Sequence, residues 1–86
     1  MSDLGVSPYN YMKVYAKSDT VACPKDPNGN PAQAVYNDGA GNITVANVDG
    51  STTLLTAVTL GVVAISPYRI DSTNTTAGPF VLLYRT

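Results

Sequence analysis

The stretch "NITVANVDGSTTLLTAV", residues Asn42–Val58, decides the fold of this chain. Asp49-Gly50 lies between two runs rich in Thr, Val, Ile and Leu, and this dipeptide between such runs is a strong signal for a β-hairpin. Asp49 carries the one charge of the stretch, and both faces of the two expected strands carry apolar side chains. Because an ordinary surface hairpin keeps one polar face in water, we expect both faces here to be covered, by the same chain or by a neighbour.

The register of this hairpin follows from its turn. If Asp49-Gly50 forms a two-residue turn, Val45 lies opposite Leu54, which predicts that Ile43, Val45 and Leu54 face the core. The second face is smaller, neutral and half apolar, with the residues Thr44, Ala46, Val48, Ser51, Thr53 and Leu55. We expect a neighbouring subunit to cover this second face, because doing so buries no charge.

The sequence on both sides of the hairpin is also typical of strands and turns. Apolar or β-branched runs predict further strands over Ala32–Tyr36, Gly61–Ile70 and Phe80–Tyr84, with an edge or a bulge at Pro67. One or two short strands are possible before them. The sequence therefore predicts an all-β fold, a small antiparallel β-sandwich or barrel of about five to seven strands, over residues 32–86. Residues 1–31 are expected to form an irregular N-terminal arm followed by a Pro-rich loop.

The composition limits the classes of partner. Of the 86 residues, 13% are charged and the net charge is −1, which gives no electrostatic reason to bind nucleic acid or an anionic membrane. No apolar run reaches the roughly 18 residues of a membrane span. A domain this small has a marginal core and usually needs a disulfide, a metal ion or oligomerisation. Cys23 is the single cysteine and His is absent, so we expect a homo-oligomer without a stable folded monomer.

Catalytic and metal sites are not expected, and we predict no cofactor. The chain has no His and no Glu, so Cys23 has no His to act as its base. Asp38 and Asp49 are both followed by Gly, where Asp is favoured by the backbone of a turn. The stretch Asp26–Asn30 alternates oxygen-bearing side chains, but it lacks the spacing of a calcium loop and is better explained as a turn. The sequence therefore does not predict an enzyme.

The last two thirds of the chain resemble a known group of proteins. "AQAVYNDGAGNITVANVDGSTTLLTAVTLGVVAISPYRIDSTNTTAGPFVLLY" resembles small virion proteins of tailed phages, a group that includes head-spike base proteins of gene transfer agents and related capsid decoration (cement) proteins. The shared features are a Gly-rich turn leading into a strand over Tyr36–Val45, the turn Asp49–Ser51, a strand ending in Arg69-Ile70, the loop Thr73–Ala77 and a last strand ending in Tyr84. Residues 1–31 match no part of this pattern.

The resemblance implies a virion structural protein on the outer capsid surface. It would be a cement protein that binds and stabilises the head, or the base of a head spike. Its partner would be the major capsid protein, and it would associate as a homotrimer, with a five-fold assembly as the alternative. The short chain favours the cement protein. A second hypothesis from another class is a β module that binds glycans or cell surfaces through Tyr and Asn on its loops.

Five residues are candidates for an interface. Tyr9, Tyr11 and Tyr15 lie in Met1–Ser18, a segment that looks too irregular for a core strand and that we expect to dock on the capsid or on an adjacent subunit. Its alternative is to fold back and plug the end of its own barrel. Tyr68 and Arg69 are the other candidates. Arg69 is expected to pair with Asp71, with an acid of a neighbouring subunit or with loop carbonyls, or else to be a solvated strand end.

Overall fold

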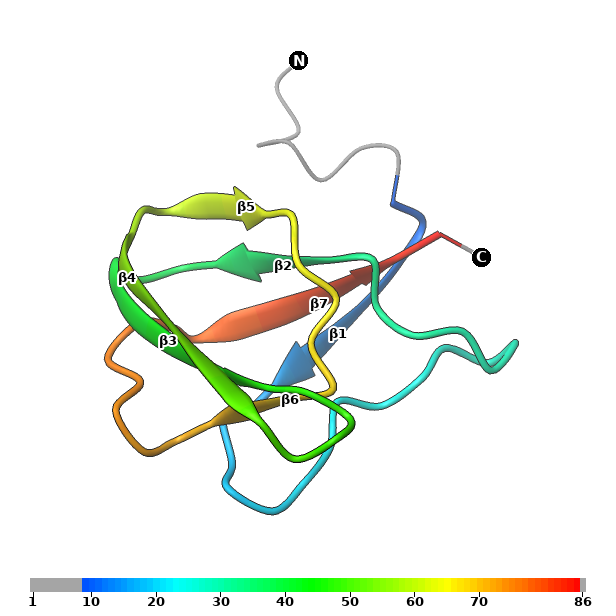
Figure 1. Ribbon diagram of the computed structural model, residues 1–86. Coiled ribbons are helices and arrows are strands. Elements are labelled where there is room, and N and C mark those ends of the chain that lie inside the picture. Colours follow the sequence, from blue (N-terminus) through cyan, green and yellow to red (C-terminus); the bar gives the residue numbers. More distant parts are fainter. Residues whose placement is uncertain (1–8, 86) are drawn as a thin grey trace.

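The computed structural model describes residues 9–85, which form two antiparallel sheets (Figure 1). One sheet has the order β1-β7-β2-β5 and the other β4-β3-β6. Within residues 9–85 there is no helix that is long and apolar enough to cross a membrane. The prediction of a small all-β fold is confirmed. The strands are β1 (Tyr11–Tyr15), β2 (Ala34–Asn37), β3 (Gly41–Ala46), β4 (Thr52–Val58), β5 (Gly61–Val63), β6 (Arg69–Asp71) and β7 (Phe80–Tyr84).

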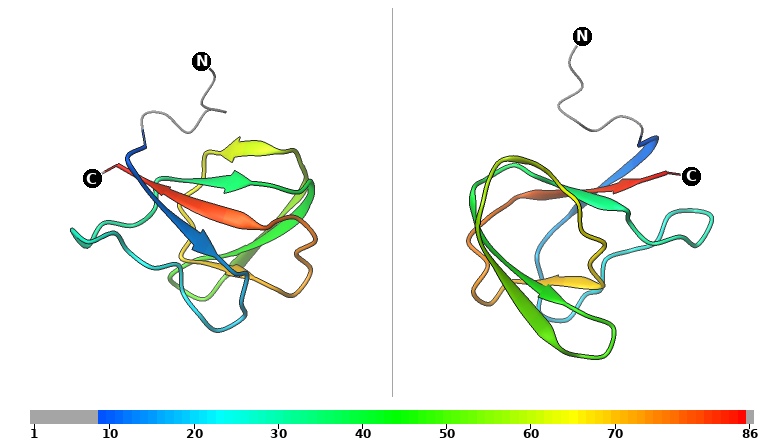
Figure 2. Two further views of the ribbon diagram at one scale, coloured as in Figure 1. Left: turned by 180° about the vertical axis from the view of Figure 1, so that it is seen from behind. Right: turned by 45° about the horizontal axis from the view of Figure 1, so that its top comes forward.

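The core lies between the two sheets, which form its two layers (Figure 2). Successive side chains of a strand point to opposite faces, so every second residue of each strand reaches this space. The buried apolar residues that pack together are Tyr15, Ala32, Val35, Ile43, Val45, Ile70, Ala77, Phe80, Leu82 and Tyr84. Both layers contribute, which explains why neither sheet has a conspicuous alternating pattern over a long range.

The hairpin β3–β4 is present, but its predicted register is wrong by one residue. Val45 pairs with Thr53 rather than with Leu54, and Ile43 pairs with Leu55. The turn has three residues rather than two, since the N–H of Asn47 donates to the carbonyl of Ser51 at 2.8 Å. Gly50, at φ 92°, takes the left-handed position that closes such a loop. A slip of one residue reverses the faces. Leu54 therefore lies outside, and Leu55 packs against the core.

The long run Gly61–Ile70 is two strands rather than one. β5 belongs to the first sheet and β6 to the second, so the chain crosses from one layer to the other between them. Pro67 lies within this crossing segment and cannot donate a bond to a ladder. The proline thus marks the place where the chain leaves one sheet for the other, not a bulge within a strand.

The segment expected to be an irregular arm contains a strand. β1 pairs with β7 in register from Tyr11 opposite Tyr84 to Tyr15 opposite Phe80. Tyr15 belongs to the buried core, so the expectation that this part of the chain is too irregular for a core strand is wrong for residues 11–15. Residues 1–8 of the expected arm lie outside the described residues.

Two backbone segments approach closely where β2 ends. The N–H of Gly78 donates to the carbonyl of Gly39 at 3.0 Å, and a Cβ atom on Gly39 would lie 2.0 Å from the carbonyl oxygen of Gly78. Asn37 is fully buried beside this contact. Its Nδ2 donates to the carbonyl of Thr59 at 3.1 Å, and its Oδ1 accepts from the N–H groups of Gly39 at 3.3 Å and Gly78 at 3.0 Å. One amide therefore joins three segments that are distant in sequence.

Candidate interaction surface

The five predicted interface residues do not form one surface. Tyr11 and Tyr15 are on the inner side of β1, where the ring of Tyr11 meets that of Tyr84 edge to face at a centroid distance of 5.3 Å. Tyr15 is only 5% exposed, so it is not available to anchor another molecule. Tyr9 is half-buried just before β1. Tyr68 is exposed and precedes β6 together with Arg69, which begins that strand.

Two of the core tyrosines hold the Pro-rich loop. The hydroxyl of Tyr15 donates to the carbonyl of Val21, and the hydroxyl of Tyr84 donates to the carbonyl of Pro24. Cys23 lies between these two anchor points, is partly buried against the core and has its own N–H bonded to the carbonyl of Tyr68 at 2.8 Å. The loop thus closes one end of the sandwich. This arrangement favours the alternative in which the N-terminal part folds back onto its own domain.

Burial changes the titration of these groups, and alkaline pH should therefore unfold the protein. Burial raises the pKa of Tyr15 and of Tyr84 from the ordinary 10.0 to about 12, and that of the Cys23 thiol from 9.0 to about 11. Each folded-state pKa lies above its unfolded value, so the contribution of these three groups to stability is fully present below about pH 9 and is lost as the pH rises from 9 to 12. The free energy of unfolding by urea, measured at steps across this range, checks the expectation.

The control for this prediction is the double variant Tyr15→Phe, Tyr84→Phe, which removes both phenols. Its stability at pH 8 is expected to be lower, because two loop carbonyls lose their donors. Its loss of stability between pH 10 and pH 12 should be smaller than that of the parent protein. An equal loss over that interval in both proteins would contradict the assignment of the alkaline transition to these tyrosines.

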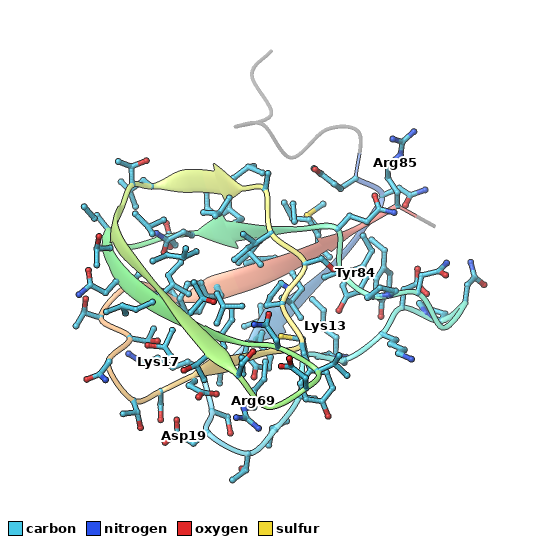
Figure 3. The ribbon with its side chains drawn as sticks, viewed as in Figure 1. Lys13, Lys17, Asp19, Arg69, Tyr84 and Arg85 are labelled. Atoms are coloured by element: carbon cyan, nitrogen blue, oxygen red, sulfur yellow. The ribbon has the colours of Figure 1, made fainter. Side chains whose placement is uncertain are left out.

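Arg69 has a partner within its own chain. Its Nε lies 2.6 Å from Oδ1 of Asp71, and the two side chains are 25% and 12% exposed. This hydrogen bond raises the pKa of Arg69 above its ordinary value. The predicted pairing of Arg69 with Asp71 is confirmed. Figure 3 shows Arg69 near Lys17 and Asp19 at one end of the molecule, where Lys17 donates to the carbonyl of Thr75 at 2.7 Å.

The loop at Asp26 is the expected turn. Oδ1 of Asp26 accepts from the N–H groups of Asn28 at 2.9 Å and Asn30 at 2.8 Å, and Gly29 has a φ of 84°. The carboxylate is therefore used to fix the local backbone, as is typical of Asp in turns. Among residues 9–85, no group of three or more His, Cys, Asp or Glu side chains is placed to hold a metal ion.

The edges of the two sheets differ in how they are protected. β6 is covered, because Ser18 and Cys23 donate backbone hydrogen bonds to the carbonyls of Ile70 and Tyr68 at 2.8 Å. β5 is an edge of only three residues. β1 is the edge strand opposite β5 in the first sheet, and β4 is the edge strand opposite β6 in the second sheet. No other described strand pairs with the free edge of either one. β4 has seven residues, none of them charged or proline. Long neutral edges of this kind are uncommon in proteins that work as monomers.

The hydrogen-bonding pattern shows which backbone groups these two edges present. Bonded pairs alternate along an antiparallel ladder. The bond from Asn47 to Ser51 therefore directs Thr53 and Leu55 toward β3, so the N–H and C=O groups of Thr52 and Leu54 point outward.

The same alternation applies to β1. The N–H of Asp38 donates to the carbonyl of Pro79 at 3.0 Å, so alternate residues of β7 from Phe80 onward bond toward β1. Phe80 lies opposite Tyr15 in the β1–β7 register. The residues of β1 between its bonded positions, Met12 and Val14, therefore direct their backbone groups away from the sheet.

The same positions carry exposed apolar side chains. Met12, Val14 and Leu54 are 50%, 75% and 49% exposed. The tyrosines of β1 were predicted to be surface anchors, whereas Met12 and Val14 were not. The sequence feature that could have indicated them is the alternation in "YMKVY": in a strand, the two tyrosines share one face, and Met12 and Val14 share the other.

A groove of about 260 Å³ lies beside the inner side of the same hairpin. It opens between β3–β4 and the segment that crosses from β5 to β6, and its lining residues are Val45, Asn47, Thr53, Leu55, Ile65, Ser66 and Pro67. The two layers are therefore not closed against each other next to β4.

Comparison with known proteins gives a relationship in fold. No protein-family model matches the chain, and no curated protein sequence matches it. A chain in the structure described as "Capsid of native GTA particle computed with C5 symmetry" has a similar fold, with a TM-score of 0.74 and 20% sequence identity. The similarity covers 96% of this chain and 90% of that chain. The described domain thus has the fold of a chain found in a gene transfer agent (GTA) capsid.

Proposed function

We propose that this chain is a virion structural protein that binds the outer surface of a phage-like capsid as a cement protein. The observation that carries the proposal is the fold shared with a chain of a GTA capsid structure over nearly the whole length of both chains. The sequence features quoted above support the proposal as well, because they resemble a group of virion proteins that includes proteins of gene transfer agents.

The chemistry of the chain supports a binding role over a catalytic one. The sequence contains no His and no Glu, and Cys23 is a partly buried thiol whose pKa is raised, which disfavours the reactive thiolate. Only 13% of the residues are charged, which suits a subunit that buries much of its surface in an assembly. Two strand edges that no other described strand covers, on β1 and β4, provide surfaces for such contacts.

The assembly proposed is a homotrimer that contacts the major capsid protein, with a five-fold spike base as the second candidate. A cement protein occupies many equivalent positions on a head, whereas a spike base is restricted to vertices. The short chain favours the first arrangement. The five-fold (C5) symmetry stated for the GTA capsid structure is the reason to retain the spike base as the second candidate.

The proposal is tested with heads that were assembled without this protein. Purified chain is added to these heads, and bound protein is separated by sedimentation and counted per head. We expect saturable binding and a higher temperature of head disruption after binding. Electron microscopy of the decorated heads then places the density at local three-fold positions or at vertices. A chain that does not bind these heads and is instead a monomer retained by a glycan array would contradict the proposal.

A further inference from the structure

We infer that the free edge of β1 in one copy of this chain pairs with the free edge of β4 in the next copy, so that the strands form one continuous sheet across the subunit boundary. The inference rests on the proposed function, because it specifies the contact between subunits of that assembly. It assigns the contact to backbone groups of Met12, Val14, Thr52 and Leu54.

The first support is the state of the four sheet edges. An exposed strand edge presents unpaired N–H and C=O groups that can accept another strand, and proteins usually block it by charge, proline, shortness or a covering segment. β6 is covered by backbone bonds from Ser18 and Cys23, and β5 has three residues. β4 has none of these protections. β1 contains Lys13, but this residue bonds toward β7, and the positions that face outward are uncharged.

The second support is the match between the two edges. On both strands, the residues whose backbone groups point outward also bear exposed side chains. Met12 and Val14 on β1, and Leu54 on β4, are each about half exposed or more. Opposite residues of an antiparallel pair place their side chains on the same face. Pairing of these edges would therefore bring the apolar side chains together and cover them, and it would bury no charge.

The third support is the position of the edges in the fold. β4 and β6 are the two opposite edges of the three-stranded sheet. The chain continues from β4 into β5 through Thr59-Leu60, whereas the chain that follows β1 reaches β6, where Ser18 bonds to Ile70 (Figures 1 and 2). A closed ring of more than two copies needs contacts between two different surfaces of the chain. Pairing of β4 with a second β4 would instead give a two-fold dimer. Because β5 is short and β6 is covered, β1 is the edge that remains for β4.

Disulfide trapping tests the pairing in the full chain. Cys23→Ala removes the native thiol, and Met12→Cys and Leu54→Cys are then introduced separately and together. Bonded residues of an antiparallel pair have Cα atoms about 5.5 Å apart, within the range of a disulfide. Mild oxidation is expected to convert the double variant into a ladder of covalent oligomers that ends at the size of the ring. Val14→Cys and Thr52→Cys, combined in the same way, form the second pair of the same antiparallel register, and Val14→Cys with Leu54→Cys samples a neighbouring register.

The single variants are the matched controls, since each lacks its partner thiol and should remain uncross-linked. Met12→Cys combined with Leu60→Cys controls for exposure alone, because Leu60 is 62% exposed but lies outside β4. Dimers of the Leu54→Cys single variant would overturn the inference in favour of pairing between two β4 strands. An equal ladder in the Leu60 control, or no ladder in any β1–β4 combination, would overturn it as well.

A second measurement distinguishes the contribution of the backbone hydrogen bonds of Leu54 from that of its side chain. Leu54→Pro removes an outward N–H, which an edge strand tolerates, whereas Leu54→Thr keeps it. We expect Leu54→Pro to raise the dissociation constant of the oligomer at least about tenfold more than Leu54→Thr does, with unchanged circular dichroism. Equal effects would contradict strand pairing.

Binding to heads separates this inference from the proposed function. The cross-linking is repeated with the chain bound to heads assembled without it. Normal binding without β1–β4 cross-links would refute the strand pairing and leave the capsid function intact. Cross-links in a chain that binds no head would refute the capsid function and leave the pairing intact.

Discussion

Gly39→Ala should lower the thermal unfolding midpoint by about 10–20 °C, since a 1 kcal/mol loss shifts the midpoint of a domain this size by about 4–8 °C and overpacking costs up to about 3 kcal/mol. The new Cβ would lie 2.0 Å from the carbonyl oxygen of Gly78. That atom belongs to the backbone of a residue whose N–H is bonded to the carbonyl of Gly39 and to Oδ1 of Asn37, so it cannot move aside as a flexible side chain would. Scanning calorimetry or thermal circular dichroism measures the effect.

Gly50→Ala is the matched control for this prediction. Unlike Gly39, Gly50 has a left-handed backbone, with a φ of 92°, and a Cβ at this position would meet nothing within 4 Å. Its cost is therefore that of left-handed backbone alone, about 1 kcal/mol. If Gly39→Ala lowered the unfolding temperature no more than Gly50→Ala does, the close approach of Gly39 to Gly78 would not be a strong constraint.

Asn37→Ala is expected to destabilise the protein by about 3 kcal/mol, because each buried group left without a partner costs about 1–3 kcal/mol. The substitution removes the donor for the carbonyl of Thr59 and the acceptor for the N–H of Gly39. No water can replace these bonds unless the packing opens, since Asn37 has 0% exposure. Chemical unfolding in urea gives the difference in free energy.

The comparison variant is Asn47→Ala in the exposed hairpin loop. Asn47 also makes a side-chain hydrogen bond, from Nδ2 to Oγ of Ser51 at 3.0 Å, but water can replace it. A loss below about 0.5 kcal/mol is expected there, as for most surface substitutions. Similar losses in the two variants would show that burial of the amide of Asn37 is not the reason for its effect.

The hairpin illustrates which parts of the fold the sequence could predict. Asp49-Gly50 correctly indicated a turn between two strands, because Gly supplies the backbone conformation that tight turns need. The dipeptide did not determine the length of the loop, since two-residue and three-residue turns both accept Asp-Gly. Consecutive Leu54 and Leu55 gave no preference for either face. The register was therefore open to an error of one residue, and this error moved Leu54 from the core to the surface.

The position of the first strand was not predicted, for a related physical reason. Met12 and Val14 are apolar although they point outward, and Lys13 interrupts the inner row that the tyrosines begin. A strand with apolar residues on both faces lacks the alternation of apolar and polar residues by which a half-buried strand is recognised. The role of Asn37 was also hidden, because Asn next to Asp-Gly is typical of a turn. Its buried bonds depend on Thr59 and Gly78, which only the fold brings close.

The candidate surface was predictable only in part. The low charge and the neutral hairpin indicated that some face of this domain should be covered by another molecule, and the pairing of Arg69 with Asp71 was foreseen. The tyrosines of β1 were expected at that surface, yet two of them face their own core. Which edges remain free depends on the order of strands in each sheet. That order results from long-range pairing, which local sequence patterns do not encode.

The end of β4 has a consequence for the solubility of the free chain. A neutral run of seven residues without proline or glycine is the kind of segment that stacks into amyloid fibrils. Between the pairs Ile43–Leu55 and Gly41–Val58 the register shifts, and Ala57 adopts a left-handed φ of 54°. This bulge interrupts the run before its end and leaves a straight part shorter than the roughly six residues that such stacking requires. A single irregular alanine thus limits the tendency of this exposed edge to aggregate while the rest of the edge stays unpaired.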